Sequence, residues 1–223
     1  MYKALIVGAG RIGAAYQWPE DPDYTHAGAY AALPSRVELA GFVEPDPKRR
    51  DAAEKKWRLL AYESLEEAPK ADIYSVCTQP QDQEAVLGQL GHAKAIWCEK
   101  PFVSTHLDPV IRLRVQVNYL RRGDGFHRRV AAMAREGSVL YVTAKDDIHT
   151  RCYFEDLASW WKAKLVYTVI DGPNSYFLRW KKEGKYQEVF FSLGGVNGAG
   201  CMRAMLGNIL DHLDGKNYLW SPA

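Results

Sequence analysis

Short apolar runs recur through the first hundred residues, and segments with helical character separate them. Each run is soon followed by glycine, proline or a charged residue, which is typical of buried strands. These runs are Ala4–Val7, Val37–Val43, Asp72–Thr78 and Ala95–Cys98. The segments between them predict helices over Ala27–Leu33, Lys48–Arg58 and Gln83–Leu90. Strands and helices that alternate in this way predict a parallel sheet with helices on both faces.

The pattern changes in the second half of the chain. The later segments predict strands over Ile111–Tyr119, Val139–Ala144 and Lys164–Ile170, and helices over Phe126–Arg135, Tyr153–Trp161 and Met202–Leu213. A hairpin is predicted about Glu183-Gly184, between Ser175–Lys181 and Lys185–Ser192. We therefore expect a mixed sheet that is covered by helices on one face.

A glycine-rich motif, Gly8-Ala9-Gly10-Arg11-Ile12-Gly13, directly follows the first strand and opens a helix. In such a motif the first glycine permits a tight turn, the second lets the backbone approach a pyrophosphate, and the third allows close helix packing. It predicts dinucleotide binding; the alternative is a glycine turn with a structural role only. The fold predicted is α/β, with a Rossmann domain built on a doubly wound parallel sheet over residues 1–104. Residues 105–223 are predicted to form an α+β domain with an open mixed sheet, for substrate binding and oligomerisation.

Glu44 ends the second strand. An acidic residue at this place conventionally accepts hydrogen bonds from the adenosine ribose, which favours NAD over NADP. The alternative is a carboxylate at a helix start, because Pro45-Asp46-Pro47 opens the next helix. The basic run Lys48-Arg49-Arg50 keeps NADP possible, since a neighbouring arginine can accommodate a 2′-phosphate.

The strand Ala95–Cys98 stops at Glu99-Lys100-Pro101, because proline cannot continue the hydrogen-bond ladder. Ligands of open α/β sheets bind outside the carboxyl ends of the strands, so Lys100 is placed to act on a bound ligand. The alternative is a solvated Glu–Lys pair. Near the glycine motif, Thr25 is a candidate N-cap, and His26 either approaches the cofactor or is satisfied within the helix start.

Composition and charge narrow the function classes. The chain is 47% hydrophobic with a formal net charge of +2, which is too balanced to indicate a nucleic-acid or membrane-surface partner. No apolar run has the length of a membrane-spanning helix, and Met1–Lys3 leads into a strand rather than a signal peptide. The four cysteines are scattered without metal-site spacing. We expect a cytoplasmic protein with reduced thiols, no bound metal and a small-molecule substrate.

Five motifs occur in the order found in the Gfo/Idh/MocA oxidoreductases. They are Gly8–Gly13, Glu44–Pro47, Val76–Pro80, Cys98–Pro101 and Val117–Arg122. The chain resembles a compact, shortened member of this family, most clearly over residues 3–122. The resemblance implies NAD(P)-dependent hydride transfer at a sugar, nucleotide sugar or similar polyol or carbonyl compound. The alternative is a non-catalytic dinucleotide-binding relative with a sensing or assembly role.

The resemblance also implies which residues form the site. Those expected at the cofactor are Gly8, Gly10, Arg11, Ile12, Gly13, Glu44, Thr78, Pro80, Glu99, Lys100 and Pro101. Lys100 would orient and polarise the substrate oxygen, and the Lys100–Pro101 bond would be cis.

The family's H-x-x-D motif falls on Tyr153-Phe154-Glu155-Asp156, so a tyrosine stands where the family keeps a histidine. Tyr153, or His149 about one helical turn earlier, would move the proton, with Asp156 retained beside it. Asn118, Arg121 and Arg122 would bind the substrate, although the two arginines could equally be solvated surface charges.

The predicted hairpin is dense in aromatic residues. They are Tyr176, Phe177, Trp180, Tyr186, Phe190 and Phe191. Because the second sheet is expected to have one uncovered face, these residues predict a homodimer formed through that sheet; an ordinary core is the alternative.

Overall fold

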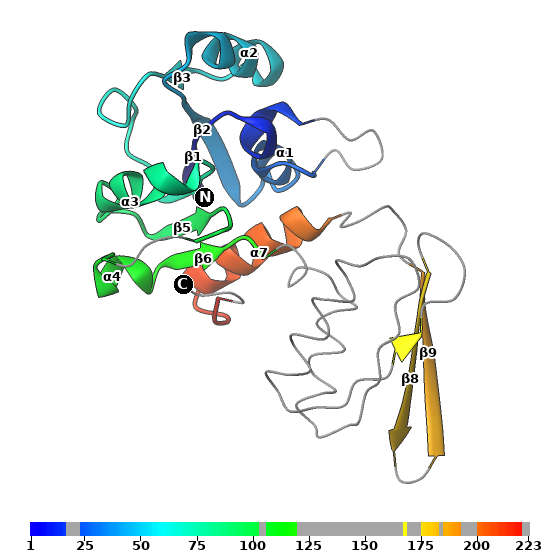
Figure 1. Ribbon diagram of the computed structural model, residues 1–223. Coiled ribbons are helices and arrows are strands. Elements are labelled where there is room, and N and C mark those ends of the chain that lie inside the picture. The colour runs from blue at the N-terminus through cyan, green and yellow to red at the C-terminus, as the bar shows by residue number, and fades with distance from the viewer. Residues whose placement is uncertain are drawn as a thin grey trace. The chain divides into compact units, whose positions relative to one another are not determined.

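The structure is a computed structural model (Figure 1), and it describes residues 1–16, 23–102, 106–119, 167–168, 175–182, 185–192 and 200–219. Of the three strand segments between residues 167 and 192, it describes the backbone. The chain divides into two compact units. The first combines Met1–Gly123 with Gly198–Ala223, and the second is Asp124–Asn197.

The first unit contains a six-stranded sheet in the order β3-β2-β1-β4-β5-β6. Its strands are β1 (Tyr2–Val7), β2 (Val37–Val43), β3 (Ala61–Tyr62), β4 (Ile73–Val76), β5 (Ala95–Cys98) and β6 (Val115–Val117). Every neighbouring pair is parallel. The strand order reverses between β1 and β4, which is the switch point at which doubly wound sheets bind ligands. The predicted Rossmann fold is confirmed.

Six helices flank this sheet in the described residues. They are η1 (Arg11–Ala15, a π-helix), α1 (His26–Ala31), α2 (Pro47–Trp57), α3 (Pro80–Gly88), α4 (Pro109–Arg112) and α7 (Cys201–Leu213). Local chemistry sets several of their starts. Thr25 Oγ1 accepts a hydrogen bond of 3.0 Å from the Gly28 amide, so Thr25 is the predicted N-cap of α1. Asp46 caps α2 in the same way, with a proline in the first turn.

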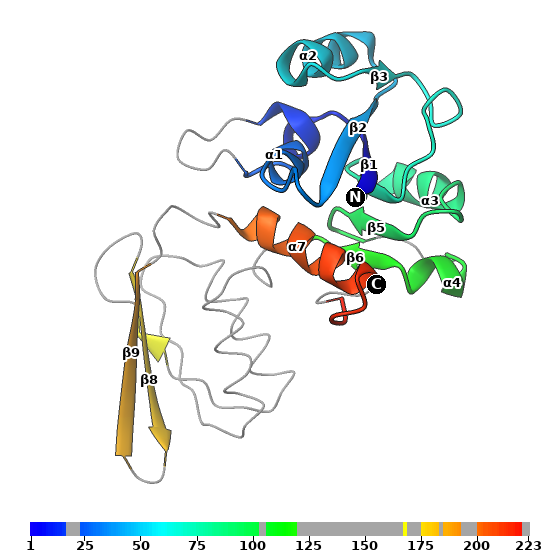
Figure 2. The ribbon, with the colours of Figure 1, turned by 180° about the vertical axis from the view of Figure 1, so that it is seen from behind.

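The buried residues form two apolar clusters, one on each face of the sheet. Neighbouring residues of β5 show the alternation, since Ile96 belongs to one cluster and Trp97 to the other. Trp97 packs with Tyr30 of α1 and shares a cluster with Leu206 of α7. The helices α1 and α7 contact each other, and they lie close together in both ribbon views (Figure 1 and Figure 2). On the opposite face Ile96 packs with Leu87 of α3.

One predicted strand is wrong in its extent. The expected strand Ile111–Tyr119 begins instead as the helical turn α4, and β6 covers only Val115–Val117. Pro109 and the side chain of Asp108, which accepts a 2.7 Å hydrogen bond from the Val110 amide, start the turn. These local signals override the alternation of apolar residues from which the strand was predicted. Leu113, one of these apolar residues, is exposed.

The strand β6 and helix α7 belong to the first unit. The sequence predicts both within the domain 105–223. In the structure, β6 extends the parallel sheet by pairing with β5, and α7 contacts β5. The observed bounds of α7 lie within one residue of the prediction.

The second unit contains a three-stranded antiparallel sheet in the order β7-β8-β9. Its strands are β7 (Tyr167–Thr168), β8 (Ser175–Lys182) and β9 (Lys185–Ser192). The pairing of Lys182 with Lys185 confirms the predicted hairpin. The predicted strand Val139–Ala144 and helices Phe126–Arg135 and Tyr153–Trp161 lie outside the described residues.

Candidate functional site

The glycine loop between β1 and η1 has two positions where only glycine fits. Gly8 has a φ of +97°, and a Cβ there would lie 2.8 Å from the carbonyl oxygen of Cys77. A Cβ on Gly13 would lie 2.1 Å from the carbonyl oxygen of Gly8. By contrast, a Cβ on Gly10 would meet no described atom within 4 Å. The first and third glycines therefore serve the turn and the packing, and the second leaves open space where a ligand can approach the backbone.

A cavity of about 1060 Å³ opens beside this loop at the carboxyl edge of the sheet. Its walls include Gly8 to Ile12, Glu44, Arg49, Lys56, Thr78, Gln79 and Asp82. The Oγ1 atom of Thr78 is buried and has no hydrogen-bond partner in the described part of the chain. A buried hydroxyl without a partner is costly, so it fits a site in which a ligand completes the hydrogen bond. Together with the open space at Gly10, it shows that these residues suit a dinucleotide.

Glu44 ties the end of β2 to the glycine loop. Its buried carboxylate accepts hydrogen bonds from the Ala9 amide at 2.9 Å and the Asp46 amide at 3.2 Å. Arg49 Nη1 lies 3.9 Å from the same carboxylate. The carboxylate at the start of α2 is that of Asp46 and not that of Glu44, because Asp46 is the N-cap of this helix. The hydrogen bond from the Arg49 amide is the main cause that lowers the pKa of Asp46. Glu44 itself places a negative charge on the cavity wall.

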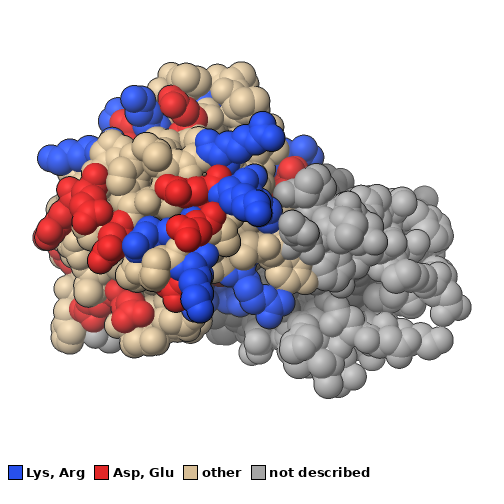
Figure 3. All heavy atoms as spheres, turned by 90° about the horizontal axis from the view of Figure 1, so that it is seen from above, with Lys and Arg blue, Asp and Glu red and all other residues tan. Residues whose placement is uncertain are grey.

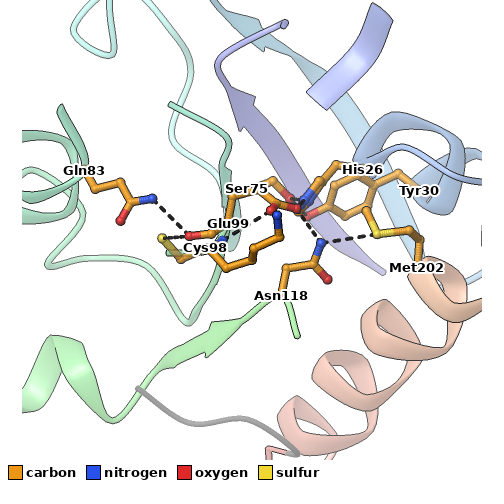
Figure 4. A network of polar contacts seen from close by, with 9 residues as sticks. His26, Tyr30, Ser75, Gln83, Cys98, Glu99, Asn118 and Met202 are labelled. Atoms are coloured by element: carbon orange, nitrogen blue, oxygen red, sulfur yellow. Dashed lines mark hydrogen bonds and ion pairs between the residues drawn. The ribbon is translucent and has the colours of Figure 1, made fainter. Parts of the chain in front are cut away.

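A buried network surrounds Glu99 at the end of β5 (Figure 4). Glu99 Oε1 lies 3.1 Å from His26 Nε2 and also accepts a short hydrogen bond from Asn118 Nδ2. Glu99 Oε2 accepts from the Lys100 amide at 3.2 Å. Burial raises the pKa of Glu99, but its contacts with His26, Asn118 and Lys100 outweigh burial, so the net pKa is lowered. Glu99 is therefore an ionised carboxylate that fixes the turn at Lys100.

The network continues from His26 to Ser75 and Tyr30. His26 Nδ1 lies 3.0 Å from Ser75 Oγ, which lies 2.9 Å from the Tyr30 hydroxyl. Burial raises the pKa of Tyr30, so its hydroxyl keeps its proton. Because ionised Glu99 can only accept, His26 Nε2 donates to it. Ser75 Oγ, which can both donate and accept, links His26 Nδ1 to the Tyr30 hydroxyl.

His26 is fully buried, and its ring packs on Trp97 with the ring centroids 3.9 Å apart. Of the two alternatives for His26, the structure therefore shows the satisfied histidine at the helix start. Ser75 and Tyr30 are not among the site residues that the sequence predicts. A hydroxyl within the apolar run of β4 was the one signal that could have found Ser75.

Several predicted cofactor residues do not line the cavity. They are Gly13, Pro80, Glu99, Lys100 and Pro101. Lys100 is exposed and follows β5, and the Lys100–Pro101 peptide bond is cis, as the resemblance implies.

Asn118 is buried, and its amide nitrogen contacts Met202 Sδ of α7 at 3.3 Å as well as Glu99 (Figure 4). Its role in substrate binding stays a prediction. Arg121, Arg122, His149, Tyr153 and Asp156 lie outside the described residues.

The charged surface agrees with the near-zero net charge. On the face shown in Figure 3, the described Lys and Arg side chains lie among Asp and Glu side chains. Within the part of the chain that is described, His, Cys, Asp and Glu side chains form no group of three that could hold a metal ion. None of the helices described has the length and apolar character needed to cross a membrane.

Comparison with known proteins identifies the fold and the family. A family model described as an oxidoreductase family with an NAD-binding Rossmann fold matches residues 2–113, half of the chain. No curated protein matches the sequence. Among solved structures, the chain is similar to the WlbA dehydrogenase of Bordetella pertussis in complex with NADH and UDP-GlcNAcA. That similarity has 13% identity and a TM-score of 0.60, and it covers 99% of this chain and 90% of that one.

Two further solved structures share the fold. The UDP-N-acetylglucosamine 3-dehydrogenase GnnA of Acidithiobacillus ferrooxidans is 13% identical, with a TM-score of 0.61 over 99% of this chain and 91% of that one. The scyllo-inositol dehydrogenase of Lactobacillus casei, with bound NAD(H) and scyllo-inositol, is 12% identical, with a TM-score of 0.51 over 97% and 88%. The family model matches half of the length of this chain, and the matched half contains the glycine loop. This chain therefore belongs to the Gfo/Idh/MocA family of NAD-binding oxidoreductases.

Proposed function

We propose that this protein transfers a hydride between NAD and a CH–OH carbon of a nucleotide sugar, a sugar or a similar polyol or carbonyl compound. One relationship carries the proposal. The glycine loop after β1 and the Glu99-Lys100-Pro101 turn after β5 lie at the carboxyl edge of one parallel sheet. A cofactor that binds in the cavity beside the glycine loop and lies along this edge would extend toward Lys100.

Each side chain has a distinct role in this proposal. Bound NAD supplies the hydride acceptor. The ammonium group of Lys100 orients and polarises the substrate oxygen, and ionised Glu99 holds the backbone at that turn through the Lys100 amide. Tyr153 or His149 takes the hydroxyl proton, with Asp156 beside it, and Asn118, Arg121 and Arg122 bind the rest of the substrate.

The charge at the cavity wall supports a preference for NAD. The buried carboxylate of Glu44 would repel the 2′-phosphate of NADP. Arg49 lies close enough to offset part of that repulsion, so we expect NADP to bind more weakly rather than to be excluded.

The ligands and names of the similar solved structures guide the choice of substrates to test. The similar structures include one with UDP-GlcNAcA bound, one named for UDP-N-acetylglucosamine and one with scyllo-inositol bound. We infer that a nucleotide sugar is the first substrate class to test and an inositol the second.

The second half of the chain completes the proposal. We assign substrate binding to the domain predicted over residues 105–223, and a homodimer to the sheet that contains the β8–β9 hairpin. Cys77, Cys98 and Cys201 are free thiols, which suits a cytoplasmic protein. Sedimentation at micromolar concentration tests the dimer, and a strict monomer would contradict it.

The experiment that tests the function is a turnover assay. UDP-GlcNAc, UDP-GlcNAcA and scyllo-inositol are offered with NAD while NADH formation is followed by absorbance. We expect turnover with at least one of them, and we expect Lys100→Ala to abolish it while NADH still binds. A protein that binds NADH but turns over no nucleotide sugar or polyol would favour the non-catalytic alternative.

A further inference from the structure

The helix that follows the glycine loop is unusually short. η1 ends at Ala15, and the polypeptide leaves the helix at Tyr16. The last carbonyl groups of any helix lack partners within the helix and need another donor. In this protein a side chain of a different helix supplies it.

Lys56, near the end of α2, donates to three consecutive carbonyl oxygens at that point. Its Nζ lies 2.9 Å from the oxygen of Ala14, 3.3 Å from that of Ala15 and 3.2 Å from that of Tyr16. An ammonium group has three donors and no acceptor. All three donors of Lys56 are therefore directed at the backbone of the glycine-loop helix.

Trp57, the next residue of α2, strengthens the same contact. Its Nε1 donates to the Ala14 carbonyl at 3.1 Å, and Lys56 Nζ lies 5.3 Å from the centre of its ring. The Ala14 oxygen thus accepts from two neighbouring side chains. Because α2 ends at Trp57, with Arg58 in the left-handed conformation, both donors lie on a well-defined helix end.

The glycine loop is consequently held at both ends. At its start Glu44 accepts from the Ala9 amide, and at its far end Lys56 and Trp57 donate to the carbonyls of Ala14 to Tyr16. A cation at the carboxyl end of a helix is favourable. Lys56 also lines the cavity.

We propose that Lys56 and Trp57 are positioning residues for the cofactor, which hold η1 so that the Gly10–Gly13 backbone keeps its pyrophosphate-binding shape. In this role Lys56 serves the protein backbone and does not contact a phosphate. The inference rests on the NAD binding of the proposed function, and it adds residues that the glycine motif does not contain.

The test is the dissociation constant of NADH, measured by fluorescence titration without substrate. Lys56→Met removes the three donors and should raise the Kd about tenfold, the effect of losing charge-assisted hydrogen bonds. Trp57→Phe removes one neutral donor and should raise the Kd by a smaller factor. Lys56→Arg keeps donors at the same place and should restore part of the affinity. Lys55→Met is the matched control, since Lys55 is an exposed neighbour of equal charge and should leave the Kd unchanged.

A second measurement needs no cofactor. Amide hydrogen exchange across residues 11–16 should be faster in Lys56→Met than in the parent and Lys55→Met proteins, because the helix end is released. Circular dichroism confirms that each variant is folded.

Three results would overturn the inference. The first is an unchanged Kd and unchanged exchange in Lys56→Met. The second is a Kd effect in Lys56→Met that disappears at high salt, with none in Trp57→Phe, because this would make Lys56 a direct phosphate ligand. The third is a parent protein that binds no NADH at all, and only this one also refutes the proposed function.

Discussion

His26 Nε2 lies 3.1 Å from Glu99 Oε1, and both side chains are buried between α1 and the end of β5. The two residues are 73 positions apart in the chain. The contact joins α1, the second helix after the glycine loop, to the turn that presents Lys100. Its strength can be measured even before a substrate is known.

Replacing His26 by alanine should destabilise the fold. The change leaves ionised Glu99 with one donor fewer in a buried place, and it empties the space against Trp97. We expect the free energy of unfolding to fall by about 3 kcal/mol, measured by urea denaturation. His106→Ala is the control, because His106 is exposed and should change stability little. Equal stability of the two variants would show that the buried contact contributes nothing.

Glu99 should also make the stability depend on pH. Its pKa is lowered below the ordinary value of 4.5, since the contacts with His26, Asn118 and Lys100 outweigh burial. A carboxyl group with a lower pKa in the folded state stabilises the protein above its unfolded pKa, and this contribution is lost as the pH falls through the folded pKa. The difference in unfolding free energy between the parent and Glu99→Gln should therefore shrink as the pH falls below 4.5. A difference that stays constant would contradict the lowered pKa.

Gly10 and Gly13 should respond differently to substitution. Gly13→Ala places a Cβ against the Gly8 carbonyl and should cost about 1–3 kcal/mol of stability, by thermal or urea unfolding. Gly10→Val has room for its side chain in the protein alone, so its fold should persist while its side chain blocks the approach of a pyrophosphate. Unweakened NADH binding by Gly10→Val would show that the cofactor does not pass this position.

Thr78→Val should separate stability from binding. The Oγ1 of Thr78 is buried without a partner in the described residues, so removing it should leave the stability of the cofactor-free protein unchanged or slightly higher. NADH affinity should fall, because the ligand loses a hydrogen bond. Thr25→Val is the contrasting variant: Thr25 Oγ1 caps α1, and its loss should cost about 1 kcal/mol. A clear loss of stability in Thr78→Val would mean that its hydroxyl already has a partner.

The proton-transfer residue can be identified once a substrate is found. Tyr153→Phe should lower kcat by about 10²–10⁴-fold if the phenol is the acid/base, and it should remove the rise of the rate with pH. If Tyr153→Phe is harmless and His149→Ala is crippling, the histidine one turn earlier has the role. Full activity in both variants would refute both assignments.

Local sequence signals determined much of this fold. Apolar runs between turn residues predicted four strands of the first sheet, and the glycine spacing predicted the loop whose geometry now excludes a side chain at Gly8 and Gly13. Thr25 was identified as an N-cap because capping depends on neighbouring residues only. Glu44 and Lys100 follow the ends of β2 and β5, as predicted, because the residues that end a strand also lie close by in the sequence.

Contacts between distant segments were decided by the tertiary structure. Nothing near Glu99 in the sequence indicates that its carboxylate meets His26 and Asn118, or that Lys56 donates to the backbone at Ala14. The apolar alternation around Leu113 predicts a long strand, yet α4 forms there and β6 joins the first sheet beside β5. Strand and turn patterns depend on interactions over a few residues. The partner of a buried charge depends instead on which elements pack together, because only the assembled core excludes water from the charged group.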